Sequence, residues 1–116
     1  MWFEVDGVQI FAQTGGRPFD PSLRTVLMIH GAGMDQTVWQ QQSRYLAHHG
    51  WNVLAVDLPG HGRSEGTAFG SVAESADWLI RLLDTAKLET VALVGHSLGA
   101  LISLDAAGRY AGRVSR

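Results

Sequence analysis

The sequence predicts an α/β fold, with a mostly parallel sheet flanked by helices and a hairpin at its N-terminus. Three short apolar runs at residues 25–29, 52–56 and 90–94 lack polar alternation, as expected of parallel strands buried on both faces. Segments with helical periodicity follow these runs, and this alternation is typical of a sheet with right-handed crossovers. Residues 3–5 and 8–13 flank an Asp-Gly turn and form the predicted hairpin.

Three helices are expected between and after the apolar runs. The first covers about residues 37–49, with a glycine as its stop. The second begins at Ser71, which forms a capping box with Glu74, and its apolar face consists of Val72, Ala76, Leu79, Ile80 and Leu83. Asp77 and Arg81 fall one turn apart on its solvent side. The third covers about residues 97–110, and its expected apolar stripe is Leu98, Leu101, Ile102 and Ala106.

Composition narrows the class of protein. A chain of 116 residues corresponds to one domain at most. Nine Lys and Arg residues stand against eleven Asp and Glu, without a basic patch, which disfavours nucleic acid and anionic membranes as partners. The absence of cysteine excludes disulfides and a thiol nucleophile. The N-terminus does not resemble a signal peptide and no apolar run could span a bilayer, so a cytoplasmic location is expected.

Residues 95–99 (GHSLG) match the pattern G-x-S-x-G. They directly follow an apolar run and open a helix, which is the strand–turn–helix setting that this pattern requires. A sharp turn projects the Ser97 hydroxyl above the sheet, while Gly95 and Gly99 leave room where the two backbones nearly touch. The helix N-terminus supplies positive potential to a developing oxyanion. We therefore predict that Ser97 is a nucleophile; the alternative is a simple helix N-cap, which needs no flanking glycines.

Residues 30–33 (HGAG) directly follow the first apolar run. A small loop at this position can aim a backbone N–H beside Ser97, so the amides of Ala32 and Leu98 are the candidate oxyanion hole. A simple glycine turn is the alternative interpretation. A dinucleotide-binding fingerprint is disfavoured because Gln36 stands where its third glycine would be.

Residues 57–64 (DLPGHGRS) follow the middle apolar run. They indicate a rigid loop in which Asp57, His61 and Arg63 can form hydrogen bonds, and we interpret them as support beside the site. His48 and His49 are adjacent in the sequence, so they point in different directions on a helix and predict a solvated helix end. No metal site is expected.

These three motifs, in this order and spacing, resemble the α/β-hydrolase fold superfamily over nearly the whole chain, in particular small cytoplasmic lactonases, esterases and carbon–carbon-bond hydrolases. The resemblance implies that Ser97 is the nucleophile and that Ala32 and Leu98 supply the oxyanion donors. Serine at position 97 argues against the epoxide-hydrolase and dehalogenase branches, which carry aspartate there. The residues expected to support the site structurally are His30, Gly31, Asp57, His61, Arg63, Gly95, His96 and Gly99.

The sequence departs from the family pattern after the nucleophile. In the family an Asp or Glu and then a His follow the serine, but no His follows Ser97, and Asp105 lies on the third helix. We therefore expect residues 1–116 to be the N-terminal portion of a single α/β-hydrolase domain, truncated before its last strands and inactive alone.

The predicted reaction is hydrolysis of an ester, lactone or related acyl bond in a small-molecule substrate. It would proceed through an acyl-enzyme, without a metal or organic cofactor. The alternatives are an acyltransferase or perhydrolase with the same nucleophile, or a non-catalytic ligand-binding protein of the same fold.

Overall fold

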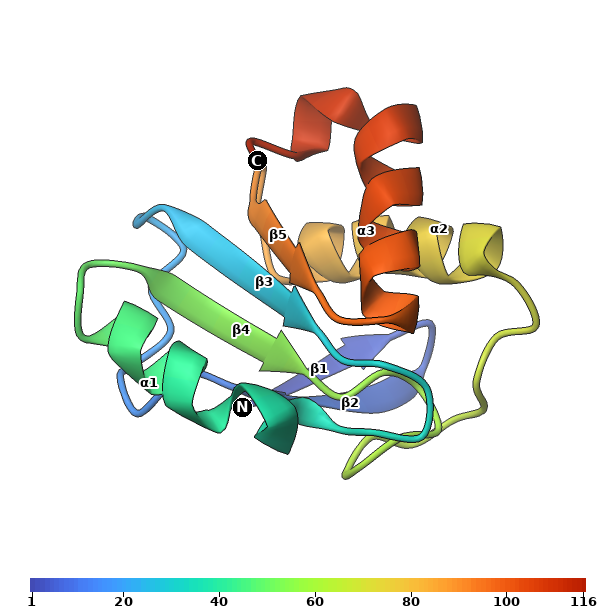
Figure 1. Ribbon diagram of the computed structural model, residues 1–116, viewed down its shortest axis with the longest axis horizontal. Coiled ribbons are helices and arrows are strands. Elements are labelled where there is room, and N and C mark those ends of the chain that lie inside the picture. Colours follow the sequence, from blue (N-terminus) through green and yellow to red (C-terminus); the bar gives the residue numbers. More distant parts are fainter.

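A single five-stranded sheet forms the centre of the computed structural model, which describes residues 1–116. The strand order is β1-β2-β4-β3-β5, with β3 parallel to both β4 and β5. Strand β2 is antiparallel to β4 and forms a hairpin with β1, as predicted. Figure 1 shows these strands, whose bounds are β1 (Trp2–Val5), β2 (Val8–Gln13), β3 (Thr25–Ile29), β4 (Asn52–Val56) and β5 (Ala92–Gly95).

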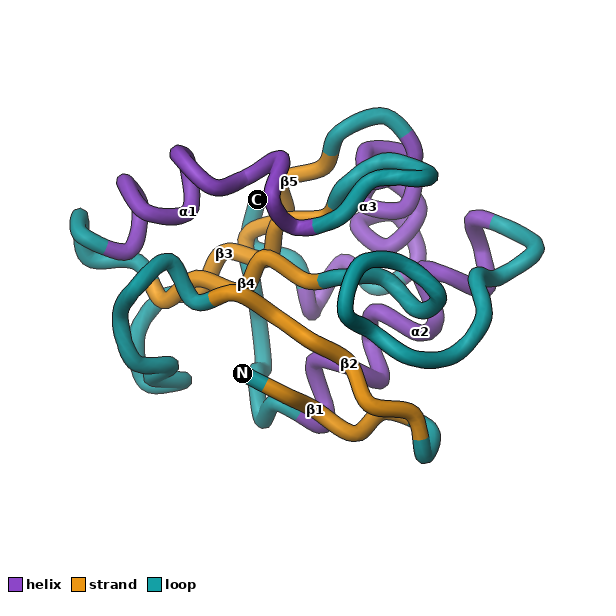
Figure 2. Tube along the Cα trace, turned by 90° about the horizontal axis from the view of Figure 1, so that it is seen from below, coloured by secondary structure: helices purple, strands orange, loops and turns teal.

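Helices cover both faces of the sheet. Alternate residues of β3 divide between two cores: Leu27 and Ile29 pack with α2 and α3, whereas Val26 and Met28 pack on the side of α1. Figure 2 shows α1 on one side of the strands and α2 on the other. The predicted α/β architecture is therefore confirmed, with the helices α1 (Gln40–Ala47), α2 (Val72–Thr85) and α3 (Leu98–Arg109). None of these helices is long and apolar enough to cross a membrane.

Side-chain caps set the starts of two helical segments. The Oγ of Ser71 accepts a hydrogen bond from the backbone N–H of Glu74 at 3.1 Å, so the predicted start of α2 is confirmed. The first predicted helix starts differently. A carboxylate oxygen of Asp35 accepts from the N–H of Thr37 at 2.9 Å and caps a short 3₁₀ helix (Gln36–Trp39), and only after it does α1 begin.

The expected apolar stripe of α3 is only partly correct. Ile102 and Ala106 are fully buried, but Leu101 is 54% exposed. Leu104 of the same helix and Val94 of β5 are exposed as well. The reason is that α3 packs on α2 and the sheet, so a second apolar side of the helix remains uncovered.

The free side of β5 meets the last residues of the chain. Val91 and Val114 form an isolated parallel bridge, and the N–H of Ser115 donates to the carbonyl oxygen of Val91 at 2.8 Å. A further hydrogen bond joins the N–H of Leu93 to Arg116. Residues 114–116 thus begin to extend the parallel sheet on the far side of β5.

Candidate active site

Ser97 occupies the sharp turn between β5 and α3. Its backbone has φ 57° and ψ −117°, a conformation that residues with a side chain rarely adopt. The residue is exposed, and its hydroxyl forms no hydrogen bond within the chain. A simple N-cap would accept a hydrogen bond from the first turn of the helix, and Ser97 accepts none. Strained backbone of this kind is concentrated at functional sites.

The two glycines flanking Ser97 are sterically required. A Cβ on Gly95 would overlap the backbone of Gly99, and a Cβ on Gly99 would overlap the backbone of Ile29. The N–H of His96 also donates to the carbonyl oxygen of Ile29 at 3.1 Å. The backbones of β3, β5 and α3 therefore meet at this turn, which accounts for the glycine spacing that the sequence shows.

The HGAG loop lies directly beside the serine. A Cβ on the buried Gly31 would be 3.2 Å from the Cβ of Ser97 and 3.4 Å from the carbonyl oxygen of His96. The backbone N–H groups of Ala32 and Leu98 donate no hydrogen bond within the chain. Both candidate oxyanion donors are thus available, one from the loop after β3 and one from the first residue of α3.

His30 joins this loop to the loop after β4. Its ring is fully buried, with Nδ1 donating to the carbonyl oxygen of Gly31 at 2.7 Å and Nε2 accepting from the N–H of Leu58 at 3.1 Å. A carbonyl oxygen can only accept, so the proton is on Nδ1. Burial lowers the pKa of His30, and the ring is held neutral. His30 can therefore orient the loop but has no nitrogen free to take a proton from Ser97.

Asp57 performs a similar linking function at the end of β4. Its carboxylate accepts hydrogen bonds from the backbone N–H of Gln36 at 2.7 Å and of Arg63 at 2.9 Å. A Cβ on Gly62 would lie 2.5 Å from the Asp57 carboxyl carbon, so the loop wraps tightly around this side chain. Ser64, which was not predicted to support the site, donates from its Oγ to the carbonyl oxygen of Asp57 at 2.6 Å. The position of Ser64 at the end of the DLPGHGRS motif is the sequence feature that could have indicated this role.

The side chains of His61 and Arg63 contribute fewer hydrogen bonds to this loop than expected. His61 Nδ1 lies 3.1 Å from the carbonyl oxygen of Pro59, and its ring centroid is 5.0 Å from that of His30. Arg63 contributes only its backbone N–H to the loop. Its guanidinium lies over the ring of Phe11, 4.2 Å from the centroid, so it packs on the hairpin.

No histidine forms a hydrogen bond with Ser97. His48 and His49 are exposed at the end of α1, where each Nδ1 bonds a carbonyl oxygen of that helix, as the predicted solvated helix end requires. His96 is exposed next to the nucleophile candidate and forms no side-chain hydrogen bond. The site therefore combines an exposed hydroxyl with two free N–H groups but without a base in contact.

The arrangement matches a known family. A family model described as the alpha/beta hydrolase fold matches residues 24–116. The chain belongs to the α/β-hydrolase family. The family assignment made from the three motifs is thus confirmed, and the motifs lie in loops at one edge of the α/β-hydrolase sheet, at the carboxyl ends of β3, β4 and β5.

Individual relatives of this α/β-hydrolase chain differ in their reactions. It is 36% identical over 94 residues to (E)-2-((N-methylformamido)methylene)succinate hydrolase of Acinetobacter baylyi, covering 80% of this chain and 33% of the relative. It is 37% identical over 112 residues to the dihydrolipoyllysine-residue acetyltransferase component of the acetoin cleaving system of Cupriavidus necator, covering 91% of this chain and 28% of that one. The chain spans about a third of the length of these relatives.

A solved structure supports the same assignment. Est816, described as an N-acyl homoserine lactone degrading enzyme, superposes with a TM-score of 0.80 at 29% identity. The match covers 98% of this chain and 42% of that one. Nearly all of the present chain therefore superposes on part of a longer lactone-degrading enzyme.

Proposed function

We propose that residues 1–116 are the N-terminal portion of a single α/β-hydrolase domain that cleaves an ester, lactone or related acyl bond with Ser97 as nucleophile. The observation that carries the proposal is the exposure and the backbone conformation of Ser97. Its hydroxyl is exposed and free of hydrogen bonds, on a strained turn at the N-terminus of a helix. Lactone degradation by Est816, as its name states, supports this class of substrate.

The proposed chemistry follows from the groups around Ser97. The Ser97 oxygen attacks the acyl carbon, and the negative charge that develops on the carbonyl oxygen is stabilised by the N–H groups of Ala32 and Leu98. Collapse of this intermediate breaks the bond to the leaving oxygen, which takes up the proton lost by the Ser97 hydroxyl and departs as the alcohol, and an ester remains on Ser97. Water then attacks that ester, releases the acid and restores the hydroxyl. The scheme requires neither a metal nor an organic cofactor.

We further propose that these residues alone lack the general base. None of the five histidines is hydrogen-bonded to Ser97, and the buried His30 has both ring nitrogens occupied. Without a base the serine hydroxyl is a weak nucleophile. Oxyanion stabilisation and binding would leave a residual acceleration of roughly 10³–10⁴ over water.

Acyl transfer is the second candidate, and a relative favours it. The Cupriavidus necator protein is by name an acetyltransferase component. The same acyl-Ser97 intermediate would serve, with another nucleophile replacing water as the acceptor. Hydrogen peroxide as acceptor would make the protein a perhydrolase. A fold used only for ligand binding remains the non-catalytic alternative.

The partners and location in this proposal rest on the sequence. A small-molecule acyl substrate suits the exposed serine, whereas the net charge of −2 disfavours nucleic acid and anionic membranes. The proposed location is cytoplasmic, as for the small cytoplasmic α/β-hydrolases that the three motifs resemble.

The test is acylation of the chain by an aryl acetate, with imidazole added as an external base. Intact mass and peptide mapping should place one acetyl group on Ser97, and Ser97→Ala should abolish it. Ser103→Ala is the matched control, since Ser103 lies on the same helix but donates to the carbonyl oxygen of Gly99 at 2.7 Å. In a protein that supplies the acid and base, Ser97→Ala should lower turnover by on the order of 10⁶.

The outcomes separate the two parts of the proposal. Equal acetylation of Ser97→Ala, or none at Ser97 with imidazole present, would remove Ser97 as nucleophile. Stoichiometric acetylation of Ser97 without imidazole would show that one of the upstream histidines acts as base. His61 would then be the first to replace.

A further inference from the structure

A hollow of about 350 Å³ lies at the edge of the sheet opposite to Ser97. It is lined by Trp51, Asn52 and Val53 at the start of β4, by the loop after β2 and by the end of α1. Parallel strands point the same way, so the amino end of β4 is remote from the carboxyl ends of β3 and β5, where the candidate active site lies. Its volume is in the range of small-molecule sites.

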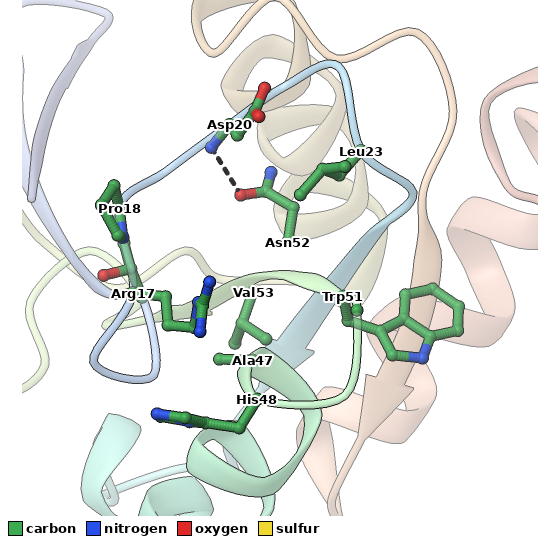
Figure 3. A pocket seen from close by; sticks show the side chains of 11 residues that line it. Arg17, Pro18, Asp20, Leu23, Ala47, His48, Trp51, Asn52 and Val53 are labelled. Atoms are coloured by element: carbon green, nitrogen blue, oxygen red, sulfur yellow. Dashed lines mark hydrogen bonds between the residues drawn. The ribbon is translucent and has the colours of Figure 1, made fainter.

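The two walls of the hollow are fixed against each other. Gly15 and Gly16 both have positive φ, and a Cβ on Gly15 would lie only 2.7 Å from the Cβ of Ala47 in α1. A Cβ on Gly16 would lie 3.9 Å from the Cε1 of His48. Figure 3 shows Arg17 reaching in from this loop, with His48 on the neighbouring wall. The close approach at Gly15 therefore brings the loop after β2 against the end of α1, so that Arg17 and His48 border the same hollow.

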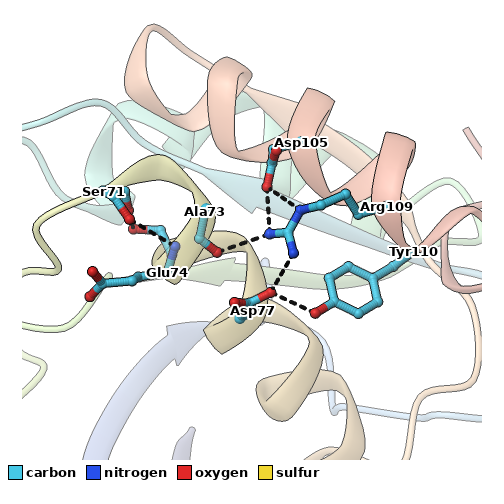
Figure 4. A network of polar contacts seen from close by, with 8 residues as sticks. Ser71, Ala73, Glu74, Asp77, Asp105, Arg109 and Tyr110 are labelled. Carbon is cyan, nitrogen blue, oxygen red and sulfur yellow. Dashed lines mark hydrogen bonds and ion pairs between the residues drawn. The ribbon is translucent and has the colours of Figure 1, made fainter.

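The cations near the hollow have no acidic partner. All four ion pairs of the chain are made by arginines elsewhere, namely Arg81, Arg109 and Arg113. Arg109, for example, pairs with two carboxylates, Asp77 on α2 and Asp105 on α3 (Figure 4). Arg17 forms no ion pair, and neither does Arg44 on the adjoining turn of α1.

One carboxylate, that of Asp20, also borders the hollow. Its Oδ1 accepts hydrogen bonds from the N–H and the hydroxyl of Ser22 at 3.0 and 2.6 Å, and these bonds lower the pKa of Asp20. Figure 3 shows this carboxylate turned away from Arg17. Asp20 therefore bonds Ser22 and forms no ion pair with Arg17.

We propose that this hollow binds a small organic molecule through an oxyanion group, either a phosphate or a carboxylate. The Arg17 guanidinium is the fork-shaped partner that such groups prefer. His48 also borders the hollow. Its Nδ1 donates to the carbonyl oxygen of Arg44 at 2.8 Å, which leaves Nε2 as the ring nitrogen without a partner in the chain. The body of the ligand would contact the apolar lining formed by Pro18, Leu23, Ala47 and Val53.

The test is a titration of the ¹⁵N-labelled chain with phenyl phosphate at constant ionic strength, followed by amide chemical shifts. We expect saturable shifts at Gly16, His48 and Asn52, and none with the neutral analogue phenol. Arg17→Gln should weaken binding by about tenfold or more, because a hydrogen bond to a charged group is lost. Lys87→Gln removes the same charge from an exposed position outside the hollow and should change the Kd by less than about twofold.

A parallel titration with benzoate identifies the preferred oxyanion, and saturable binding of either ion supports the site. The same spectra report whether each variant is folded. Three results would overturn the proposal: no saturable shift at these amides up to ~20 mM of either ion, equal binding of phenol, or equal losses in folded Arg17→Gln and Lys87→Gln.

Discussion

The loops that leave β5 and β4 lie at the same edge of the sheet but are built in opposite ways. In the turn after β5, Ser97 is exposed, strained and free of hydrogen bonds. In the loop after β4, Asp57 is buried and accepts two backbone N–H groups, and Ser64 is also buried and bonded. Buried polar groups need partners, whereas an exposed hydroxyl can remain free for chemistry. The difference indicates that one loop supplies the reactive group and the other holds the scaffold.

The largest effect is expected from breaking the loop after β4. Asp57→Ala removes a carboxylate that accepts two charge-assisted hydrogen bonds and leaves the N–H groups of Gln36 and Arg63 without partners. The free energy of unfolding should fall by about 3–5 kcal/mol, measured by urea denaturation. Asp57→Asn retains one acceptor oxygen and should lose roughly half as much. A loss below ~1 kcal/mol for Asp57→Ala would show that the loop does not depend on this side chain.

A smaller but still large effect is expected at the turn after β5. Gly99→Ala places a methyl group on the backbone of Ile29 and should destabilise the chain by about 3 kcal/mol. Gly108→Ala is the matched control, because Gly108 lies on the same helix with no atom near its Cβ position. It should stabilise the chain by about 0.5–1 kcal/mol. Equal unfolding midpoints for the two variants would contradict the close approach of α3 to β3.

The smallest effect concerns the strain at Ser97. Ser97→Gly should raise the free energy of unfolding by about 1 kcal/mol, because glycine adopts positive φ without a steric cost. Ser97→Ala keeps the strain and should leave stability within ~0.5 kcal/mol of the parent. Thermal unfolding of the three proteins measures both differences. If glycine and alanine gave the same stability, the turn would store no strain.

Much of the fold could be predicted because its signals are local. Apolar runs without alternation identified β3, β4 and β5, and Ser71 marked the start of α2. The buried face of α3 was harder to predict from the sequence, because the uncovered side of this helix is also apolar. Leu101 has the hydrophobicity of a core residue, but only the packing of α3 on α2 shows that it lies on the exposed side.

Charge pairing could not be predicted from spacing. Asp77 and Arg81 are one turn apart on α2, yet each bonds a residue distant in the sequence. Arg81 pairs with Asp6 in the hairpin turn at 2.9 Å, while Asp77 accepts from Tyr110 and Arg109 (Figure 4). These bonds lower the pKa of Asp77 and raise that of Tyr110. The partners of both residues come from segments that only the tertiary fold brings next to α2.

The sequence by itself determined the strand–turn–helix around Ser97 and the family, because glycine spacing and apolar runs act over a few neighbouring residues. Only the tertiary structure decided which groups meet across the sheet edge. It placed Gly31 against Ser97, used the ring of His30 to join two loops, and turned Arg63 onto the hairpin. Such contacts join segments that are far apart in the chain, and their geometry is set by how the strands and helices pack.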